Sequence, residues 1–128
     1  MLATAALQVT ETAPRVLVVD DDATFRRMLV AVLDDEGFDV LGVARDGLEG
    51  VALARSLRPD AIMLDVRMPG LDGLAAGRQI REDDQAVRLV FLSAYDDQTL
   101  KREAEALGAT DFLVKGCRLA ELVDALVR

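Results

Sequence analysis

The sequence contains no histidine and no tryptophan among its 128 residues, and it has a single cysteine, Cys117. Without histidine, the chain cannot form a Ser/His/Asp triad, a Cys/His catalytic pair or the commonest kind of zinc site. One cysteine cannot form a disulfide within the chain, and we interpret Cys117 as a small, partly buried apolar residue. These absences exclude several hydrolase classes and favour a protein of the reducing cytoplasm.

Aromatic residues are scarce at 4%, although 52% of the chain is hydrophobic, so we expect a core of aliphatic side chains. No apolar run reaches the length of about 18 residues that a membrane span needs, and the first residues lack the basic segment of a secretory signal. The formal net charge of −8 would repel a phosphate backbone. We therefore expect one domain over residues 15–128 behind a flexible tail at 1–14, with no direct nucleic-acid or membrane partner.

Five short apolar runs alternate along the chain with five segments of helical periodicity. The runs, which we predict to be strands, lie at 15–19, 39–43, 61–64, 88–92 and 111–114. The predicted helices are one that ends at Gly37, followed by 47–57, 72–83, 97–107 and 118–127. Strands that alternate with helices are typical of a parallel sheet covered on both faces. The sequence predicts a three-layer, doubly wound α/β domain with five helices and the strand order 2-1-3-4-5.

Four of the five predicted strands end on residues that can take part in chemistry. The first strand ends at the acidic run 20–22, the third at Asp65, the fourth at Ser93 and the fifth at Lys115. In such sheets, ligands bind outside the carboxyl ends of the strands, near the point where the winding reverses. A single aspartate there is usually a turn or helix-cap residue. Acids, a hydroxyl and an ammonium on four separate strands instead indicate a functional site.

The residue types of this set favour phosphoryl chemistry. Carboxylates that face one cleft repel each other unless a cation lies between them. Oxygen ligands without nearby histidine or cysteine favour Mg²⁺, or Mn²⁺, over zinc. A carboxylate can accept a phosphoryl group as a nucleophile, and a metal, a lysine and a hydroxyl can stabilise the transferring group. Because Asp65 stands apart from the acidic run, we expect it to be the nucleophile.

Four stretches of the sequence carry a family resemblance: VLVVDDD (16–22), AIMLDVRMPGLDG (61–73), LVFLSAY (89–95) and FLVKG (112–116). Together they resemble the receiver domain of two-component response regulators, in that family's order and over nearly the whole chain. The resemblance implies a flavodoxin-like fold of the chemotaxis-regulator type. It also implies a signalling domain rather than an enzyme, one that promotes its own aspartyl phosphorylation and dephosphorylation.

The resemblance implies an acceptor and a metal site, position by position. Asp65 matches the aspartate that accepts the phosphoryl group. Asp20 and Asp21 match the family's acidic pair, so Asp20, Asp21 and Asp65 would bind Mg²⁺. The backbone carbonyl of Arg67 matches a further metal ligand.

The other matches concern the binding of the phosphoryl group and the response of the domain to its transfer. Ser93 and Lys115 match the residues that contact the phosphoryl oxygens. Ser93 and Phe112 match a switch pair whose movement repacks the face made by the fourth helix, the fifth strand and the fifth helix. Arg67 and Tyr95 occupy positions that tune the rate of dephosphorylation.

The resemblance also implies partners. The donor would be the phosphohistidine of a sensor histidine kinase or a phosphotransfer protein, or a small acyl phosphate. The changed face would bind an output domain, a downstream protein or a second copy of the chain. The sequence holds no recognisable output domain, so a stand-alone regulator and a fragment both stay open. Gly116 departs from the proline that often follows the family's lysine, which leaves open a trans bond and the reach of Lys115.

Two other classes of protein compete for these motifs. Asp20 and Asp22 also fit the D-x-D-x-T pattern of haloacid-dehalogenase-like phosphatases, as nucleophile and general acid, although this leaves Asp65 without a role. A flavin-binding domain of the same architecture would need a phosphate loop after the first strand, where three acids would repel the flavin phosphate. Asp22 and Asp72 are each more typical of helix caps than of metal ligands.

Overall fold

The computed structural model describes residues 13–127, so the tail predicted at 1–14 lies almost wholly outside the described residues, as does residue 128. Five strands are present: β1 (Arg15–Val19), β2 (Asp39–Ala44), β3 (Ala61–Asp65), β4 (Arg88–Ser93) and β5 (Asp111–Val114). Five helices alternate with them: α2 (Ala23–Asp35), α3 (Gly47–Leu57), α4 (Gly73–Asp83), α5 (Gln98–Ala106) and α6 (Leu119–Val127). Each predicted strand and helix is present, with ends within two residues of the prediction.

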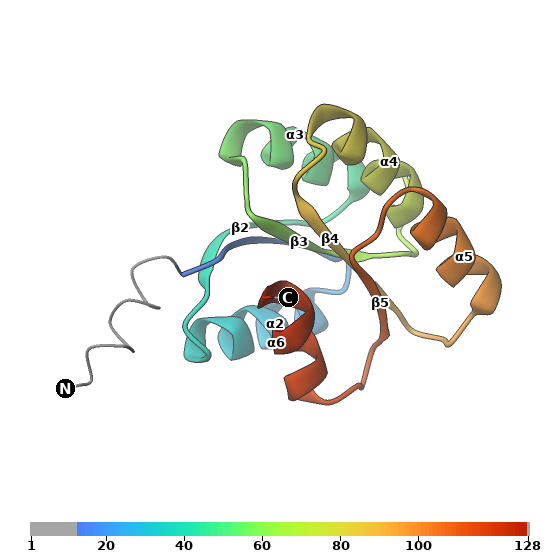
Figure 1. The fold of residues 1–128 in the computed structure, drawn as a ribbon. Coiled ribbons are helices and arrows are strands. Elements are labelled where there is room, and N and C mark those ends of the chain that lie inside the picture. Colours follow the sequence, from blue (N-terminus) through green and yellow to red (C-terminus); the bar gives the residue numbers. More distant parts are fainter. Residues whose placement is uncertain (1–12, 128) are drawn as a thin grey trace.

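The strands form one parallel sheet in the order β2-β1-β3-β4-β5. Helices α2 and α6 cover one face, and α3, α4 and α5 cover the other (Figure 1). The predicted three-layer, doubly wound fold is therefore confirmed. The chain passes from β1 to β2 on one side, and it then returns past β1 to β3 on the other side. The switch point of the winding therefore lies between β1 and β3.

The hydrophobic core has two halves, one on each face of the sheet, because successive side chains of a strand point to opposite faces. Leu17 and Val19 of β1 belong to the half under α3, α4 and α5, whereas Val16 and Val18 belong to the half under α2 and α6. Most residues in both halves are aliphatic, as the composition predicted, and Phe91 is a fully buried exception. The sheet is thus buried on both faces, and its edge after the strand ends is left for a site.

Aspartates begin four of the helices. Each lies at the N-cap, where its carboxylate accepts hydrogen bonds from backbone N–H groups of the first turn: Asp22, Asp46, Asp72 and Asp97. The cap role expected of Asp22 and Asp72 is confirmed. Part of the acidic excess therefore stabilises helix ends rather than forming a binding site.

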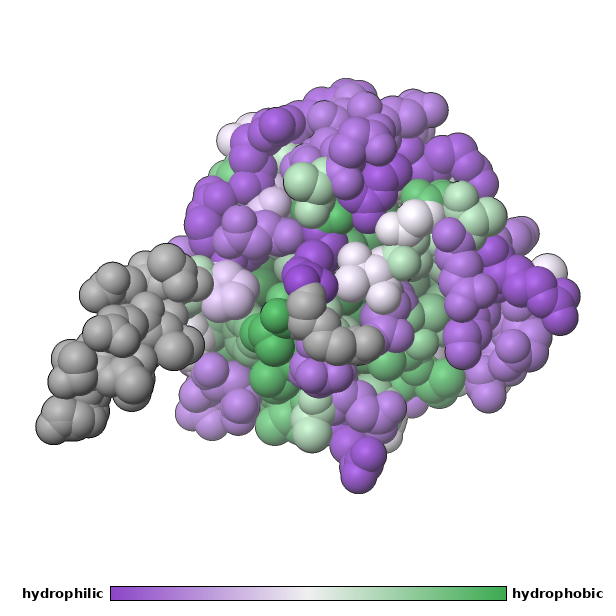
Figure 2. All heavy atoms as spheres, in the orientation of Figure 1, coloured by the Kyte–Doolittle hydropathy of each residue, from purple (hydrophilic) through white to green (hydrophobic). Residues whose placement is uncertain are grey.

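The face of the molecule that Figure 2 shows is uneven in hydropathy. In the view of Figure 2, hydrophilic residues cover α3, α4 and α5, whereas hydrophobic side chains show around α6. Two of the exposed apolar residues there are Leu119 and Val127, with 41% and 54% of their surface exposed. Within residues 13–127, no helix has the length and apolar character needed to cross a membrane.

Candidate functional site

The carboxyl edge of the sheet gathers three carboxylates from two adjacent strands. Asp20 and Asp21 follow β1, and Asp65 is the last residue of β3. Because Val19 pairs with Leu64, the residues that come next on the two strands lie side by side. One oxygen from each of the three carboxylates lies within 4.8 Å of the others. The structure thus brings together, at the switch point, the acids that the strand ends predicted.

The three acids differ in burial. Asp20 and Asp65 have 1% and 5% of their surface exposed, whereas Asp21 faces solvent. The N–H of Asp20 donates to the carbonyl of Ala44 at 3.0 Å, and its Oδ1 accepts the N–H of Asp22 at 2.8 Å. These bonds fix Asp20 at the inner side of the cluster.

Lys115 reaches both buried acids from the end of β5. Its N–H donates to the carbonyl of Ser93 at 2.7 Å, which continues the pairing of β4 with β5 by one residue. Its Nζ lies 2.9 Å from Oδ2 of Asp20 and 3.5 Å from Oδ2 of Asp65. The side chain is 20% exposed. The reach of Lys115, which the sequence left open, is therefore sufficient for contact with both carboxylates.

Gly116 forms the turn that follows Lys115. Its φ of 97° lies in the left-handed region, which glycine adopts without steric cost and proline cannot adopt. No peptide bond within residues 13–127 is cis, so the Lys115–Gly116 bond is trans. The N–H of Cys117 donates to the carbonyl of Val114 at 3.0 Å and closes the turn. Cys117 itself is a partly buried free thiol, as predicted.

Burial and neighbouring charges shift the pKa values of the site. Burial, the charge of Asp20 and the contact with Asp21 raise the pKa of Asp65 to about 7, although Lys115 opposes the rise. Burial alone would lower the pKa of Lys115, but its hydrogen bond with Asp20 and the charges of Asp65 and Asp20 raise it above its ordinary value. Near neutral pH, the cluster without a cation therefore holds Asp65 partly protonated and Lys115 charged.

The donor set of the cluster suits a hard divalent cation. It offers carboxylate oxygens only, since the chain has no histidine and Cys117 is not part of the cluster. Within the described residues, the buried Oδ2 of Asp20 meets the ammonium of Lys115 and takes no other hydrogen bond. Mg²⁺ and Mn²⁺ prefer oxygen ligands of this kind, and Asp20, Asp21 and Asp65 are the residues that could hold them.

The other predicted site residues surround the cluster. Ser93 ends β4 beside Asp65, is 2% exposed, and accepts the N–H of Tyr95 on its Oγ at 3.2 Å. Phe112 is 8% exposed and packs in the core half under α3, α4 and α5. Tyr95 is 71% exposed, and Arg67 also faces solvent. Ser93 thus shares the edge with the acids, while the roles of Phe112, Tyr95 and Arg67 stay predictions.

The absence of a side chain at Gly73 lets the loop after β3 fold back onto the strand. The N–H of Gly73 donates to the carbonyl of Val66 at 2.8 Å. A Cβ at this position would overlap the carbonyl oxygen of Asp65. Helix α4 therefore begins directly against the backbone of Asp65.

Two residues of α2 touch the site, although the sequence pattern did not predict these contacts. Nζ of Lys115 lies 4.4 Å from the centroid of the Phe25 ring, which is a cation–π contact. Nη1 of Arg26 donates to the backbone carbonyl of Asp20 at 2.7 Å. In the sequence, Phe25 fits the apolar stripe of an amphipathic helix, and its contact with the end of β5 depends on tertiary packing. The sequence signal that could have predicted these contacts is the position of Phe25 and Arg26, which lie within about one helical turn of the acidic run.

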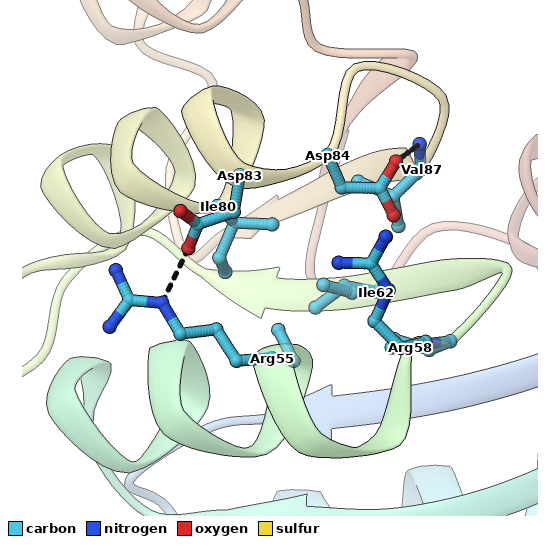
Figure 3. A pocket seen from close by; sticks show the side chains of 9 residues that line it. Arg55, Arg58, Ile62, Ile80, Asp83, Asp84 and Val87 are labelled. Carbon is cyan, nitrogen blue, oxygen red and sulfur yellow. Dashed lines mark hydrogen bonds and ion pairs between the residues drawn. The ribbon is translucent and has the colours of Figure 1, made fainter.

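A small hollow lies at the end of the sheet opposite the acid cluster. It is lined by the ends of α3 and α4 and by the segments that enter β3 and β4, and it encloses about 10 Å³, the room of a single water. Figure 3 shows Arg55 and Asp83 on its rim, with Nε of Arg55 donating to Oδ2 of Asp83 at 2.6 Å. This pair joins α3 to α4 on the surface, where ion pairs stabilise weakly. The hollow is a packing gap rather than a second site.

The geometry does not favour the phosphatase alternative. In that alternative Asp22 would be the general acid, but its Oδ1 accepts the N–H groups of Thr24 and Phe25 at 3.0 and 3.2 Å as the cap of α2. Asp65, which the alternative leaves without a role, is instead a buried member of the cluster.

Fold and site together define an α/β domain with an acidic pocket and a lysine at the switch point of its parallel sheet. The sequence model of the response regulator receiver domain matches residues 16–127, and the chain belongs to that family. The resemblance seen in the four motifs is therefore confirmed.

Curated relatives include stand-alone and longer proteins. The chain is 37% identical over 112 residues to the chemotaxis protein CheY of Thermotoga maritima, which covers 88% of this chain and 93% of that protein. It is 46% identical over 115 residues to the transcriptional regulatory protein PrrA of Mycobacterium tuberculosis, which covers 88% of this chain and 48% of that protein. The chain thus spans nearly all of one relative and about half of the other.

Solved structures agree with the fold. A chain of the CheX-CheY-BeF3-Mg complex from Borrelia burgdorferi matches with a TM-score of 0.82 and 30% identity, over 87% of this chain and 84% of that chain. Chemotaxis protein CheY4 of Vibrio cholerae matches with a TM-score of 0.82 and 32% identity, over 90% of this chain and 99% of that chain. The flavodoxin-like architecture of chemotaxis-type receiver domains is thus shown for this chain.

Proposed function

We propose that this receiver domain accepts a phosphoryl group on Asp65 in the cytoplasm and acts as a signalling domain rather than as an enzyme on other substrates. The observation that supports the proposal best is the ammonium of Lys115 placed 3.5 Å from the buried carboxylate of Asp65, beside two further acids. A buried acid of this kind, held against a lysine at the switch point of an open sheet, is suited to group transfer.

The proposed reaction is a nucleophilic displacement at phosphorus. A carboxylate oxygen of Asp65 forms a bond to the phosphorus of the donor. The bond from phosphorus to the donor's phosphohistidine nitrogen, or to the oxygen of a small acyl phosphate, breaks, and its electron pair leaves with the donor. The Lys115 ammonium and the Ser93 hydroxyl bind the oxygens of the transferring group.

We propose that Asp20, Asp21, Asp65 and the backbone carbonyl of Arg67 hold Mg²⁺, or Mn²⁺, for this reaction. Bound there, the cation offsets the repulsion between the acids and neutralises charge on the phosphoryl oxygens. Asp65 must be ionised to act as a nucleophile, and its pKa of about 7 without metal leaves part of the population protonated. A cation bound beside Asp65 would increase its ionised fraction, because nearby positive charge lowers the pKa of a carboxyl group.

The proposed output is a shift between two states of the α5-β5-α6 face. Ser93 and Phe112 would move together when the phosphoryl group binds, while Arg67 and Tyr95 would tune how fast it is lost. Phosphorylation biases an equilibrium that exists without it. The partners are a sensor histidine kinase or phosphotransfer protein as donor, and an output domain, a downstream protein or a second copy as receiver of the signal.

Intact-mass spectrometry tests the acceptor chemistry. After incubation with acetyl phosphate and Mg²⁺, the wild-type chain should gain one phosphoryl group, and omission of Mg²⁺ should prevent the gain. Asp65→Asn should gain none, whereas Asp39→Asn, which alters an exposed strand residue far from the cluster, should match the wild type. An adduct that survives Asp65→Asn and disappears in Asp20→Asn would support the phosphatase alternative instead.

Light scattering after size exclusion tests the homodimer. If the α5-β5-α6 face pairs on phosphorylation, the mass should double only in the sample treated with acetyl phosphate and Mg²⁺. An unchanged mass in a fully phosphorylated sample would leave a different protein as the partner of this face.

A further inference from the structure

We infer that Phe25 is a positioning residue: its ring holds the Lys115 ammonium where the transferring phosphoryl group is to be bound. The inference rests on the proposed function and adds a residue of α2 to the site. The contact that supports it is the 4.4 Å separation between Nζ of Lys115 and the centroid of the Phe25 ring.

Lys115 needs such a support because the hydrogen bonds of its backbone do not orient its side chain. Its backbone is tied to Ser93 and belongs to the closed turn over Gly116, but Gly116 is exposed and has no side chain that could pack against the lysine. A lysine side chain has four rotatable bonds and no planar group that would orient it. Contacts to the ammonium itself must therefore select its position.

The two carboxylate contacts of the ammonium change during the proposed reaction, whereas the ring contact does not. Asp20 and Asp65 pair with Lys115 at 2.9 and 3.5 Å in the metal-free chain, and both are proposed to turn to the cation. Asp65 would also carry the phosphoryl group. The Phe25 ring neither titrates nor binds metal, and its face attracts a cation at every stage.

The first turn of α2 holds the backbone of Phe25 in place. The N–H of Phe25 donates to Oδ1 of Asp22, the cap of α2, at 3.2 Å. Asp22 thus positions the first turn of α2, which carries the Phe25 ring. Asp20, two residues earlier in the same acidic run, contacts the Lys115 ammonium. The acidic run and Phe25 act on Lys115 as one local unit.

The far side of the ring is open, so its removal should not collapse the core. Phe25 and Lys115 line an apolar cavity of about 170 Å³ between α2 and the segment that follows β5. Phe25 is only half-buried and packs at the margin of its core half. Phe25→Leu therefore keeps apolar bulk and removes the π face, whereas Phe25→Tyr keeps the face.

The chain has only two lysines, Lys101 and Lys115, which makes the contact directly measurable. In protein labelled with ¹³C at the ε-carbon of lysine, NMR should give two ε-methylene signals, assigned with Lys101→Arg. The Lys115 signal should be displaced upfield by the ring current. The displacement should disappear in Phe25→Leu and persist in Phe25→Tyr and in Met28→Leu, a control at an exposed position of the same helix.

Phosphoryl uptake from acetyl phosphate at saturating Mg²⁺ gives the second measurement. Phe25→Leu should lower the rate about threefold to tenfold, as expected for loss of a cation–π contact, with the midpoint for Mg²⁺ unchanged within twofold. Phe25→Tyr should restore the rate. In a Lys115→Met background, Phe25→Leu should have no further effect.

Three results would overturn the inference. They are a Lys115 signal that is not displaced in the wild type, a wild-type uptake rate in Phe25→Leu, and an equal loss from Phe25→Leu in the Lys115→Met background, which would indicate packing alone. A wild-type chain that takes up no phosphoryl group would refute the proposed function, and the lysine signals would still decide whether Phe25 positions Lys115.

Discussion

Asp65 occupies a position that favours its uncharged form until a cation arrives. Its folded-state pKa of about 7 lies above the ordinary value of 3.8, chiefly because of burial and the charge of Asp20. A carboxyl group with a raised pKa stabilises the fold fully at pH values below 3.8, and that contribution is lost as the pH rises to 7. The burial of Asp65 beside the charge of Asp20 thus favours cation binding and also lowers the stability of the metal-free fold at neutral pH.

Asp65→Asn should therefore stabilise the metal-free domain at pH 7.5. Removing one of three neighbouring charges should add about 1–3 kcal/mol to the free energy of unfolding and raise the melting temperature by roughly 5 °C or more. Thermal unfolding followed by circular dichroism in EDTA measures the change.

The pH profile of the same variant provides the control. The wild-type chain should lose stability relative to Asp65→Asn between about pH 4 and pH 7, and Asp39→Asn should follow the wild type. A lower melting temperature for Asp65→Asn at neutral pH would contradict the repulsion among Asp20, Asp21 and Asp65.

At the scale of elements, the sequence identifies the strands and helices because capping residues and glycines mark where the helices begin and end. Asp46 and Asp97 cap helices, and Gly37 and Gly108 follow helix ends with positive φ. Three strands extend one residue further than their apolar runs, and two of those extra residues are Asp65 and Ser93. Backbone pairing continues where side-chain hydrophobicity ends, so the pattern could not show that these site residues are part of the sheet.

The sequence did not predict the contacts that depend on how a helix packs against the end of the sheet. The acid cluster followed from a rule about the edge of parallel sheets, which needs only the strand order. The ring of Phe25 under Lys115 and the bond from Arg26 to Asp20 depend on how α2 lies against β5 and β1. A local pattern shows which face of a helix is apolar but not which residue that face meets.

The capping role of Asp22 gives a prediction for α2. Asp22→Ala should cost about 1 kcal/mol of stability, because two N–H groups lose their acceptor. Asp46→Ala, at the cap of α3, should cost a similar amount. Urea unfolding measures both, and both variants should still take up a phosphoryl group. Complete loss of uptake in well-folded Asp22→Ala, with Asp46→Ala active, would revive Asp22 as a general acid.

The start of α4 gives a second prediction at this scale. Gly73→Ala should displace the backbone of Asp65, since a Cβ there would overlap its carbonyl oxygen, and should lower both stability and phosphoryl uptake. Gly42→Ala is the matched control, because its Cβ would lie 3.4 Å from Cδ1 of Leu57, an ordinary contact. Melting temperatures and uptake rates of the two variants measure the difference. Equal behaviour would mean that the loop after β3 adapts freely.

For the whole molecule, the acid cluster predicts that the fold and the cation are coupled. A ligand that binds only the folded state stabilises it, by about 1.4 kcal/mol at a concentration ten times its dissociation constant. Millimolar Mg²⁺ should therefore raise the wild-type melting temperature by several degrees. Asp65→Asn and Asp21→Asn should show a smaller rise, and Asp39→Asn the full one. No rise in the wild type would remove the metal site from the account.

The central claim is that the domain carries its phosphoryl group on Asp65, and the most direct measurement locates that group. Borohydride cleaves an aspartyl phosphate reductively and leaves homoserine in place of the aspartate. After treatment of the phosphorylated chain, peptide mass spectrometry should find homoserine at position 65 alone. Homoserine at position 20, or at no position in a chain that has gained a phosphoryl group, would contradict the account.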